Sequence, residues 1–369
     1  MEEALELIAE EDPPSPADVD DDSEADATVP PIRYDITSYG ADYDVEGLVR
    51  RLNRGEIFIP AFQRDFVWKQ PEASRFIESL LLGLPVPGIF LAKDRETNKF
   101  LVIDGQQRLR SLQYFYEGYF NPRERDKRQR VFDLSGVQER FKGKTYATLE
   151  ETDRIRLHNA ILHATVIKQD SPADDDTSIY HIFERLNSVG RPLTPQEIRV
   201  ALYHGPFMDE IRRWNALTAW REIFGKPNLR LKDQELILRF LALYFDSERY
   251  ERPMAEFINK FAARHRNPGG EFLARASNTF EQTLTAYHRS LGREAFRPGR
   301  TLNAAIFDSA MVGLARRLDA GPTPSDGEVA DRYRALIADP EYAEATSRST
   351  ADEAFVKTRL RKATEYFTS

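Results

Sequence analysis

The sequence of 369 residues contains no cysteine. This absence excludes disulfide bonds, thiolate nucleophiles and cysteine-based zinc sites, and it is compatible with any redox compartment. Histidine is also scarce, and the six histidines form neither an HExxH motif nor an HxH pair. Zinc-dependent hydrolysis and Ser-His-Asp catalysis are therefore without support in the sequence.

Long hydrophobic runs are missing as well, which excludes a transmembrane helix. The first residues are acidic and lack the basic and apolar regions of a signal peptide. We therefore expect a cytoplasmic protein with no membrane partner.

Basic residues are absent from the N-terminal stretch. Residues 1–30 hold twelve Asp and Glu, several prolines, and no Lys or Arg. This composition predicts disorder, and we assign residues 1–35 to a disordered acidic tail. Such a tail can keep the protein in solution, or it can compete with nucleic acid for a basic groove. The rest of the chain has a slight excess of basic residues, which permits nucleic-acid binding without requiring it.

Two regions of different periodicity follow the tail. Residues 36–195 alternate short apolar runs with helical patterns, so we expect a small mixed sheet there. Residues 196–369 have helical spacing almost throughout and are predicted to form a helical bundle. The predicted fold class is therefore α+β, followed by an all-helical C-terminal domain. The expected helices of that domain are 196–204, 207–217, 231–245, 253–265, 271–290, 301–318, 326–337 and 350–366.

The stretch 100–112 predicts a buried strand that runs directly into a helix. Residues 101–103 form an apolar run typical of a strand covered on both faces. Gly105 allows a sharp turn, and Gly118 can end the following helix. Residues 88–92 predict a second strand that forms a hairpin with the first, and a further strand is expected at 131–134.

Four polar residues occupy this strand-to-helix junction. The amino end of a helix attracts anions, and Arg108 can fork onto a phosphate. Asp104 can hold a metal ion, orient a water or cap the helix. Gln106 and Gln107 can donate and accept hydrogen bonds around a nucleotide. The alternative is an ordinary turn with Arg108 on the surface, and spacing alone leaves both open because a single glycine falls short of a glycine-rich phosphate loop.

An aromatic segment precedes this junction. Phe62, Phe66 and Trp68 alternate with amide and charged groups that include Gln63 and Arg64. This pattern suits a platform for bases or sugars. The alternative is packing under the sheet, which we favour for Phe66 and Trp68.

A charged run follows the junction helix at residues 121–130. Its basic residues are Arg123, Arg125, Lys127, Arg128 and Arg130. The first interpretation is a solvated loop. The second is a segment that lies along a nucleic-acid backbone.

Three segments together resemble one known family. Residues 103–109, IDGQQRL, resemble the DGQQR signature of GmrSD-type, modification-dependent restriction proteins. Residues 59–68 resemble the family's IPxYQRxYxW segment, and residues 182–193 resemble its FxRLNxxGxPL segment. The three motifs occur in the family's order and cover roughly residues 40–205. The resemblance implies a ParB/sulfiredoxin-like fold for residues 36–195.

The resemblance also implies a nucleotide site. We expect Asp104, Gln107 and Arg108 to act on a nucleoside triphosphate, with Mg²⁺ bound at Asp104. The other expected nucleotide-binding residues are Gln63, Arg64, Gly105, Gln106, Arg185 and Asn187, the last two on the ground of resemblance only. The expected function is NTP hydrolysis coupled to DNA recognition in a prokaryotic restriction or anti-phage system. Phe62 and the basic run 123–128 are the candidate DNA contacts.

The alternative is a sensor or clamp that binds nucleotide or DNA without turnover. Complete GmrSD-type nucleases carry a His-dependent HNH domain, and this sequence has no recognisable HNH motif. A separate nuclease subunit is therefore a possible partner. The resemblance is also compatible with a homodimer.

Overall fold

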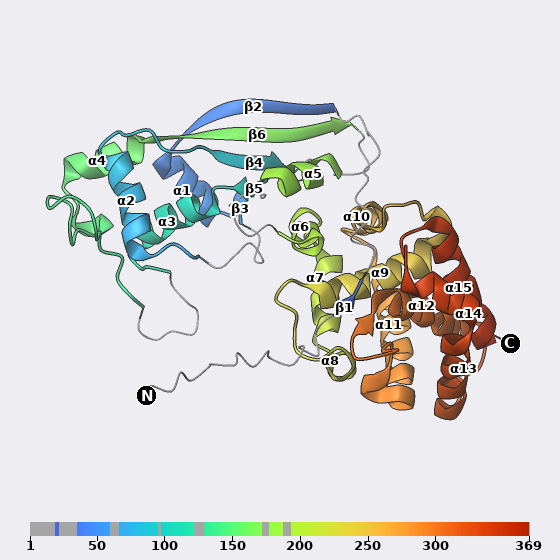
Figure 1. Ribbon diagram of the computed structural model, residues 1–369. Helices are drawn as coiled ribbons and strands as arrows, with labels where there is room; N and C mark the ends of the chain where they lie inside the picture. The colour runs from blue at the N-terminus through green and yellow to red at the C-terminus, as the bar shows by residue number, and fades with distance from the viewer. Residues whose placement is uncertain are drawn as a thin grey trace, which may run out of the picture. The chain divides into compact units, whose positions relative to one another are not determined.

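The computed structural model describes residues 19–21, 35–59, 66–94, 97–121, 129–171, 177–186 and 193–368. These residues divide into two compact units, which are described separately (Figure 1). The sheet unit contains the described residues from 35 to 203. The helical unit contains residues 204–368 together with 19–21. The division falls eight residues after the boundary predicted at 195/196, so the first helix assigned to the bundle belongs to the sheet unit.

The sheet unit is built on a five-stranded mixed sheet. Its strands are β2 (Asp35–Asp44), β3 (Ile57–Phe58), β4 (Ile89–Lys93), β5 (Phe100–Asp104) and β6 (Ile161–Ser171), in the order β2-β6-β4-β5-β3. β2 and β6 pair antiparallel, β6 and β4 parallel, and β5 and β3 parallel. β4 and β5 form the predicted antiparallel hairpin.

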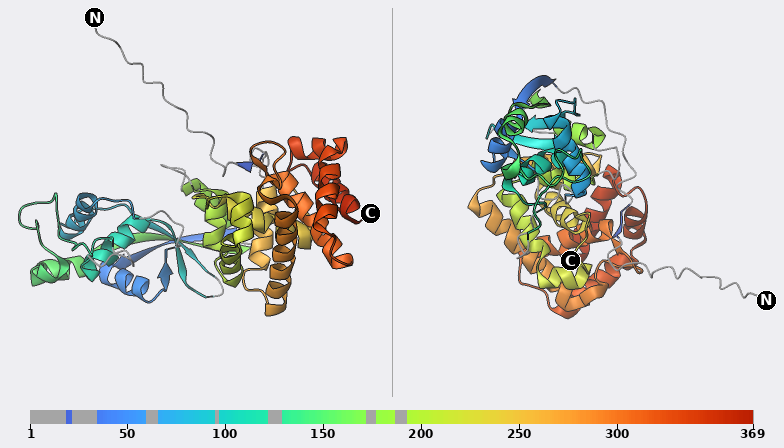
Figure 2. Two further views of the ribbon diagram at one scale, coloured as in Figure 1. Left: turned by 90° about the horizontal axis from the view of Figure 1, so that it is seen from below. Right: turned by 90° about the vertical axis from the view of Figure 1, so that its left-hand side faces the viewer.

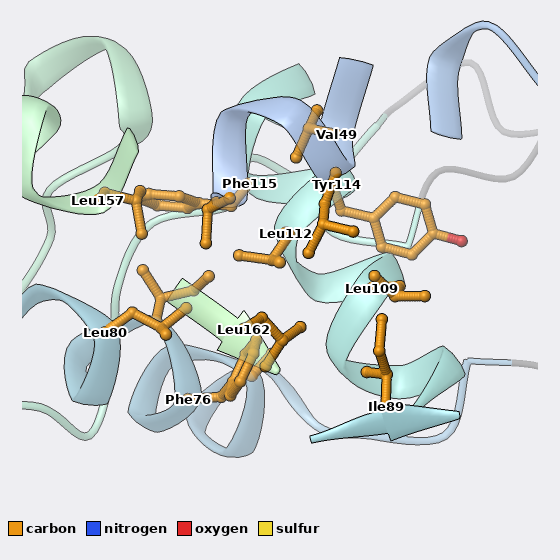
Figure 3. Packing of buried hydrophobic residues seen from close by; sticks show 14 of the residues in the cluster. Val49, Phe76, Leu80, Ile89, Leu109, Leu112, Tyr114, Phe115, Leu157 and Leu162 are labelled. Carbon is orange, nitrogen blue, oxygen red and sulfur yellow. The ribbon is translucent and has the colours of Figure 1, made fainter. Parts of the chain in front are cut away.

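Helices cover one face of this sheet (Figure 1). They are α1 (Val45–Asn53), α2 (Gln70–Leu81), α3 (Gln106–Glu117) and α4 (Glu151–Asn159), with a 3₁₀ turn at Tyr146–Thr148. Their apolar side chains form one core with the strands. Figure 3 shows Leu109, Leu112 and Phe115 of α3 facing residues of the sheet and of α2 in this core. Burial of this apolar surface fixes α3, and therefore its amino end, against β4 and β6.

β5 is buried on both faces, as the sequence predicts. Val102 belongs to the core under α1–α3 and has no exposed surface. Leu101 and Ile103 point to the opposite face because side chains alternate along a strand, and they are also buried. α5 (Thr177–Leu186) packs against β5 and β6 and is followed by α6 (Pro195–Leu202).

The helical unit confirms the predicted mostly helical C-terminal region (Figure 2). α12 is buried along most of its length and packs against α9, α11 and α15. The short helices α8 and α14 were not predicted. The helices are α7 (Pro206–Asn215), α8 (Thr218–Phe224), α9 (Lys232–Asp246), α10 (Met254–Arg264), α11 (Gly270–Leu291), α12 (Ala304–Ala320), α13 (Asp326–Ala338), α14 (Pro340–Ser347) and α15 (Glu353–Thr368). 3₁₀ turns lie at Ser247–Arg249 and Gly292–Glu294.

Two segments differ from the sequence-based expectations. Within residues 1–35, which were expected to be disordered, Val19–Asp20 form strand β1, paired in parallel with β7 (Leu302–Asn303). The strand expected at 131–134 is wrong, because its only ladder contact is an isolated bridge between Tyr119 and Val131. Phe132 and Leu134 are fully buried, and their N–H groups donate to carbonyls of nearby loops. Burial of an irregular segment thus imitates a strand pattern.

No helix in the described ranges is long and apolar enough to cross a membrane.

Candidate functional site

The junction between β5 and α3 depends on a glycine. Gly105 has a φ of 97°, in the left-handed region that favours glycine. A Cβ atom at this position would lie 2.4 Å from Cγ2 of Ile89, the first residue of β4. Asp104 pairs in register with Phe90 just before this turn. The chain can therefore bring Asp104 and the start of α3 close to β4 only with glycine at position 105.

The first turn of α3 carries no side-chain cap from the described residues. The first N–H groups of a helix have no partner within the helix, and the dipole adds partial positive charge there. α3 is ended by Gly118 in the left-handed conformation, as predicted. The amino end of α3 is therefore suited to an anion.

Arg108 is held by three oxygen atoms. Its guanidinium donates to the carbonyl of Pro87 at 2.8 Å, to the carbonyl of Gly88, and to Oδ2 of Asp104 at 3.0 Å. Its side chain is 15% exposed, whereas that of Asp104 is 46% exposed. Arg108 thus ties the loop before β4 to α3 and orients the carboxylate of Asp104. The alternative that Arg108 is a solvated surface residue is therefore wrong.

Gln107 connects two of the sequence motifs. Its Oε1 accepts hydrogen bonds from the backbone N–H groups of Val67 at 3.1 Å and Trp68 at 3.2 Å. Its Nε2 and the Oε1 of Gln106 are buried and have no hydrogen-bond partner among the described residues. A buried polar atom without a partner costs about 1–3 kcal/mol. Because the protein itself covers both atoms, they are a local cost of building this junction and are closed to a ligand in this conformation.

The aromatic segment before α2 contributes packing. Phe66 is buried and makes edge contacts with the rings of Tyr114 and Phe120. Trp68 is half-buried and packs edge-on against Phe76. The packing interpretation favoured for Phe66 and Trp68 is therefore confirmed.

The structure brings together part of the predicted site. Asp104, Gly105, Gln106, Gln107 and Arg108 lie at one junction. Arg185 is exposed on α5, the helix that packs against β5. The remaining candidates lie outside the described residues, so they remain predictions: Phe62, Gln63, Arg64, Arg123, Arg125, Lys127, Arg128 and Asn187.

Sequence reasoning missed the backbone groups of the site. The carbonyls of Pro87 and Gly88 and the N–H groups of Val67 and Trp68 bind the motif side chains. The glycine at position 88 was a partial signal in the sequence. In the structure, a Cβ at Gly88 would lie 2.7 Å from the carbonyl oxygen of His163. Glycine is required there for the close approach of β4 and β6.

No group of three or more His, Asp or Glu is placed to hold a metal ion in the part of the chain that the structure describes. A Mg²⁺ ion bound with a nucleotide differs from such a cage, since it takes one or two carboxylates and the phosphates. Asp104, exposed at a strand end, fits that smaller requirement.

These features define an α+β domain with a polar strand-to-helix junction at the carboxyl end of β5. Residues 45–204 match the family described as GmrSD restriction endonuclease, N-terminal domain. This match confirms the predicted family for residues 45–204. The domain indicates a protein of a restriction or anti-phage system.

One curated relative is the uncharacterized protein MJ0686 of Methanocaldococcus jannaschii. It is 33% identical over 90 residues, which cover 18% of this chain and 16% of that protein. The matched part is thus a small fraction of either chain.

Proposed function

We propose that the junction of β5 and α3 binds a nucleoside triphosphate and hydrolyses it, and that this turnover is coupled to DNA recognition in a restriction or anti-phage system. The observation that carries the proposal is the uncapped amino end of α3 beside the half-exposed carboxylate of Asp104. Positive helix-end charge next to a carboxylate that can hold a cation is the combination that a phosphate-bearing ligand with Mg²⁺ would use.

The phosphates would lie against the N–H groups at the start of α3. Asp104 is itself negative, so it would repel a phosphate unless a cation lies between them. Mg²⁺ bound by Asp104 and by the phosphates would neutralise this repulsion. Arg108 would act as a positioning residue, because its donors hold Asp104 and the loop before β4. Gln106 would contact the ligand, and Gln107 would hold the segment at Val67 and Trp68 beside it.

The test is phosphate release from ATP, GTP, CTP and UTP with Mg²⁺, with and without duplex DNA. The variant is Asp104→Asn, and the matched control is Glu139→Gln, which removes one charge from a side chain that is 86% exposed in the same unit. Turnover in the wild type and the control, with loss in Asp104→Asn, is the expected result. Equal turnover in both variants would contradict the role of Asp104.

A melting-temperature shift with each nucleotide separates binding from hydrolysis. Stabilisation without phosphate release would favour the sensor or clamp that binds without turnover. If the protein shows no stabilisation by any nucleotide and no phosphate release, the nucleotide proposal is wrong.

DNA binding is tested through the basic run. Arg123→Glu with Arg125→Glu is expected to weaken binding to all duplex sequences and to reduce the salt dependence of affinity. Unchanged affinity would show that this run does not contact DNA.

A further inference from the structure

The helical unit contains a buried cluster of charges. Asp308 of α12 is fully buried and accepts hydrogen bonds from Nε of Arg239 at 2.6 Å and from Nε and Nη2 of Arg359, both at 3.1 Å. Two buried guanidinium groups thus share one buried carboxylate. Excess charge in a low-dielectric interior is costly, so this arrangement calls for a further anion.

That anion comes from the N-terminal segment. Asp21 accepts hydrogen bonds from Nη1 of Arg239 at 3.0 and 3.1 Å, and its Oδ2 lies 2.8 Å from Nζ of Lys232. The Asp21 side chain is only 4% exposed. Lys232 also pairs with Glu235 at 2.9 Å. Asp21 thus adds a second carboxylate to Arg239 and a carboxylate partner to Lys232.

A short strand places this carboxylate. Val19 pairs with Leu302 and Asp20 with Asn303, in the parallel sense. β7 is held independently of this pairing, because Asn303 accepts the N–H of Ile306 and donates to the carbonyl of Thr346. The receiving edge is therefore anchored within the helical unit. The strand pairing and the ion pairs together recognise an extended chain followed by a carboxylate.

We infer that β7, Lys232 and Arg239 form a binding site for an extended acidic peptide segment of a partner protein, and that residues 19–21 fill this site as a displaceable segment of the same chain. The charge of the site and the backbone edge beside it define the chemistry of the partner segment. Residues 19–21 show which geometry the site accepts.

The strand pairing between residues 19–20 and β7 is short. The segment contributes a two-residue strand, of which Val19 is half-buried and Asp20 exposed. Of residues 19–21, Asp21 makes the hydrogen bonds to Arg239 and the ion pair with Lys232. Tethering gives such a segment an effective concentration on the order of millimolar, so a partner peptide must compete against this local excess. Weakening the tethered segment should therefore open the site.

The experiment uses the full chain with Asp21→Lys, which places a positive charge against Lys232 and Arg239. The matched control is Asp20→Lys, with the same charge change on the exposed neighbouring residue. The probe is a fluorescein-labelled peptide with the sequence of residues 15–26, followed by fluorescence anisotropy. Asp21→Lys is expected to bind the probe at least about tenfold more tightly than Asp20→Lys, which keeps its tethered segment.

Specificity is tested with two further peptides and a second substitution. A peptide with Asn in place of Asp21 and a peptide of scrambled order should both bind weakly to Asp21→Lys. Adding Lys232→Gln, which removes the cation without creating a partner for the introduced lysine, should weaken binding of the native peptide. Equal binding by Asp21→Lys and Asp20→Lys, or equal binding of native and scrambled peptides, would overturn the inference. A gain of affinity for duplex DNA without a gain for the peptide would also overturn it, since the site would then recognise phosphates.

Asp21→Ala provides a second route if the lysine variant fails to fold. The native peptide should raise the melting temperature of Asp21→Ala and leave that of the wild type unchanged at the same concentration. The peptide with Asn at the position of Asp21 should stabilise neither protein. No stabilisation of Asp21→Ala by the native peptide would contradict the inference.

Discussion

Both units contain an aspartate bound by arginine, but the two arrangements differ in burial. In the sheet unit, Asp104 is 46% exposed and pairs with Arg108 at the carboxyl end of β5. In the helical unit, Asp308 is fully buried between Arg239 and Arg359. The first pair lies beside polar atoms that lack partners, whereas the second is part of a network of matched charges.

This difference separates a carboxylate that can still bind a ligand, Asp104, from a carboxylate that the protein itself occupies, Asp308. A buried carboxylate between two guanidinium groups has its hydrogen-bonding capacity occupied by protein, so its loss affects folding. A half-exposed carboxylate at an uncapped helix end retains capacity for a ligand, so its loss affects binding. Substitutions in the two units should therefore be distinguished by whether they change stability or ligand binding.

The largest effect is expected for Asp308→Ala. It leaves Arg239 and Arg359 buried without this carboxylate, which should lower the free energy of unfolding of the helical unit by about 3–5 kcal/mol. The measurement is urea unfolding followed by tryptophan fluorescence, because Trp214 and Trp220 are buried in this unit. Asp331→Ala is the control, since the Asp331 side chain is 79% exposed. A loss below about 1 kcal/mol would mean that the ion pairs of Asp308 with Arg239 and Arg359 contribute no more than ion pairs on the protein surface.

The next effect is expected for Gly105→Ala. The new Cβ would meet Ile89 and also sit at a positive φ, so we expect a loss of about 2–4 kcal/mol in the sheet unit. Gly118→Ala is the matched control, with a φ of 82° but no atom within 4 Å of the added Cβ. It should cost only about 1 kcal/mol. Hydrogen exchange of β5 and α3 reports on this unit, and equal effects of the two variants would show that contact with Ile89 is unimportant.

Arg108→Ala should have a smaller effect on stability and a large one on ligand binding. It removes the hydrogen bonds to Pro87, Gly88 and Asp104, and we expect a loss of about 1–3 kcal/mol. The loop before β4 should exchange its amide hydrogens faster, and nucleotide binding should weaken because Asp104 loses its orientation. Normal loop protection with lost nucleotide binding would instead indicate that Arg108 contacts the phosphates directly.

The local part of this junction was predictable from sequence. The apolar run 101–103, Gly105 and Gly118 are signals carried by neighbouring residues, and they gave the strand, the turn and the helix. The partners of Arg108 and Gln107 were not predictable, because they are backbone atoms of residues about 20 and 40 positions away. Backbone groups leave no mark in a side-chain pattern.

The same limit explains β2. Residues 36–40 of this strand are exposed, so the segment has no apolar alternation to indicate a strand. Its conformation follows from pairing with β6, more than a hundred residues later. The helices of the helical unit were predictable because each carries its own apolar stripe, and short helices such as α8 and α14 offer too few turns for that signal.

The smallest effect is expected at Asp339, a carboxylate of the helical unit that is less buried than Asp308. It caps α14 by accepting the N–H of Tyr342, and it also accepts hydrogen bonds from Lys362 and Tyr366. The hydrogen bond from Lys362 is the main cause that lowers the pKa of Asp339 to about 2 from its ordinary value of 3.8. Asparagine can still cap the helix, so Asp339→Asn removes mainly the charge that pairs with Lys362 and should cost about 1 kcal/mol at pH 7.

The pH dependence of this cost follows from the direction of the pKa shift. A carboxylate whose folded-state pKa is lowered stabilises the protein above its ordinary pKa, and this contribution is lost as the pH falls toward about 2. The difference in unfolding free energy between wild type and Asp339→Asn should therefore shrink between pH 4 and pH 2, measured by urea unfolding with tryptophan fluorescence. A difference that stays constant over this range would mean that the charge of Asp339 is not the source of the cost.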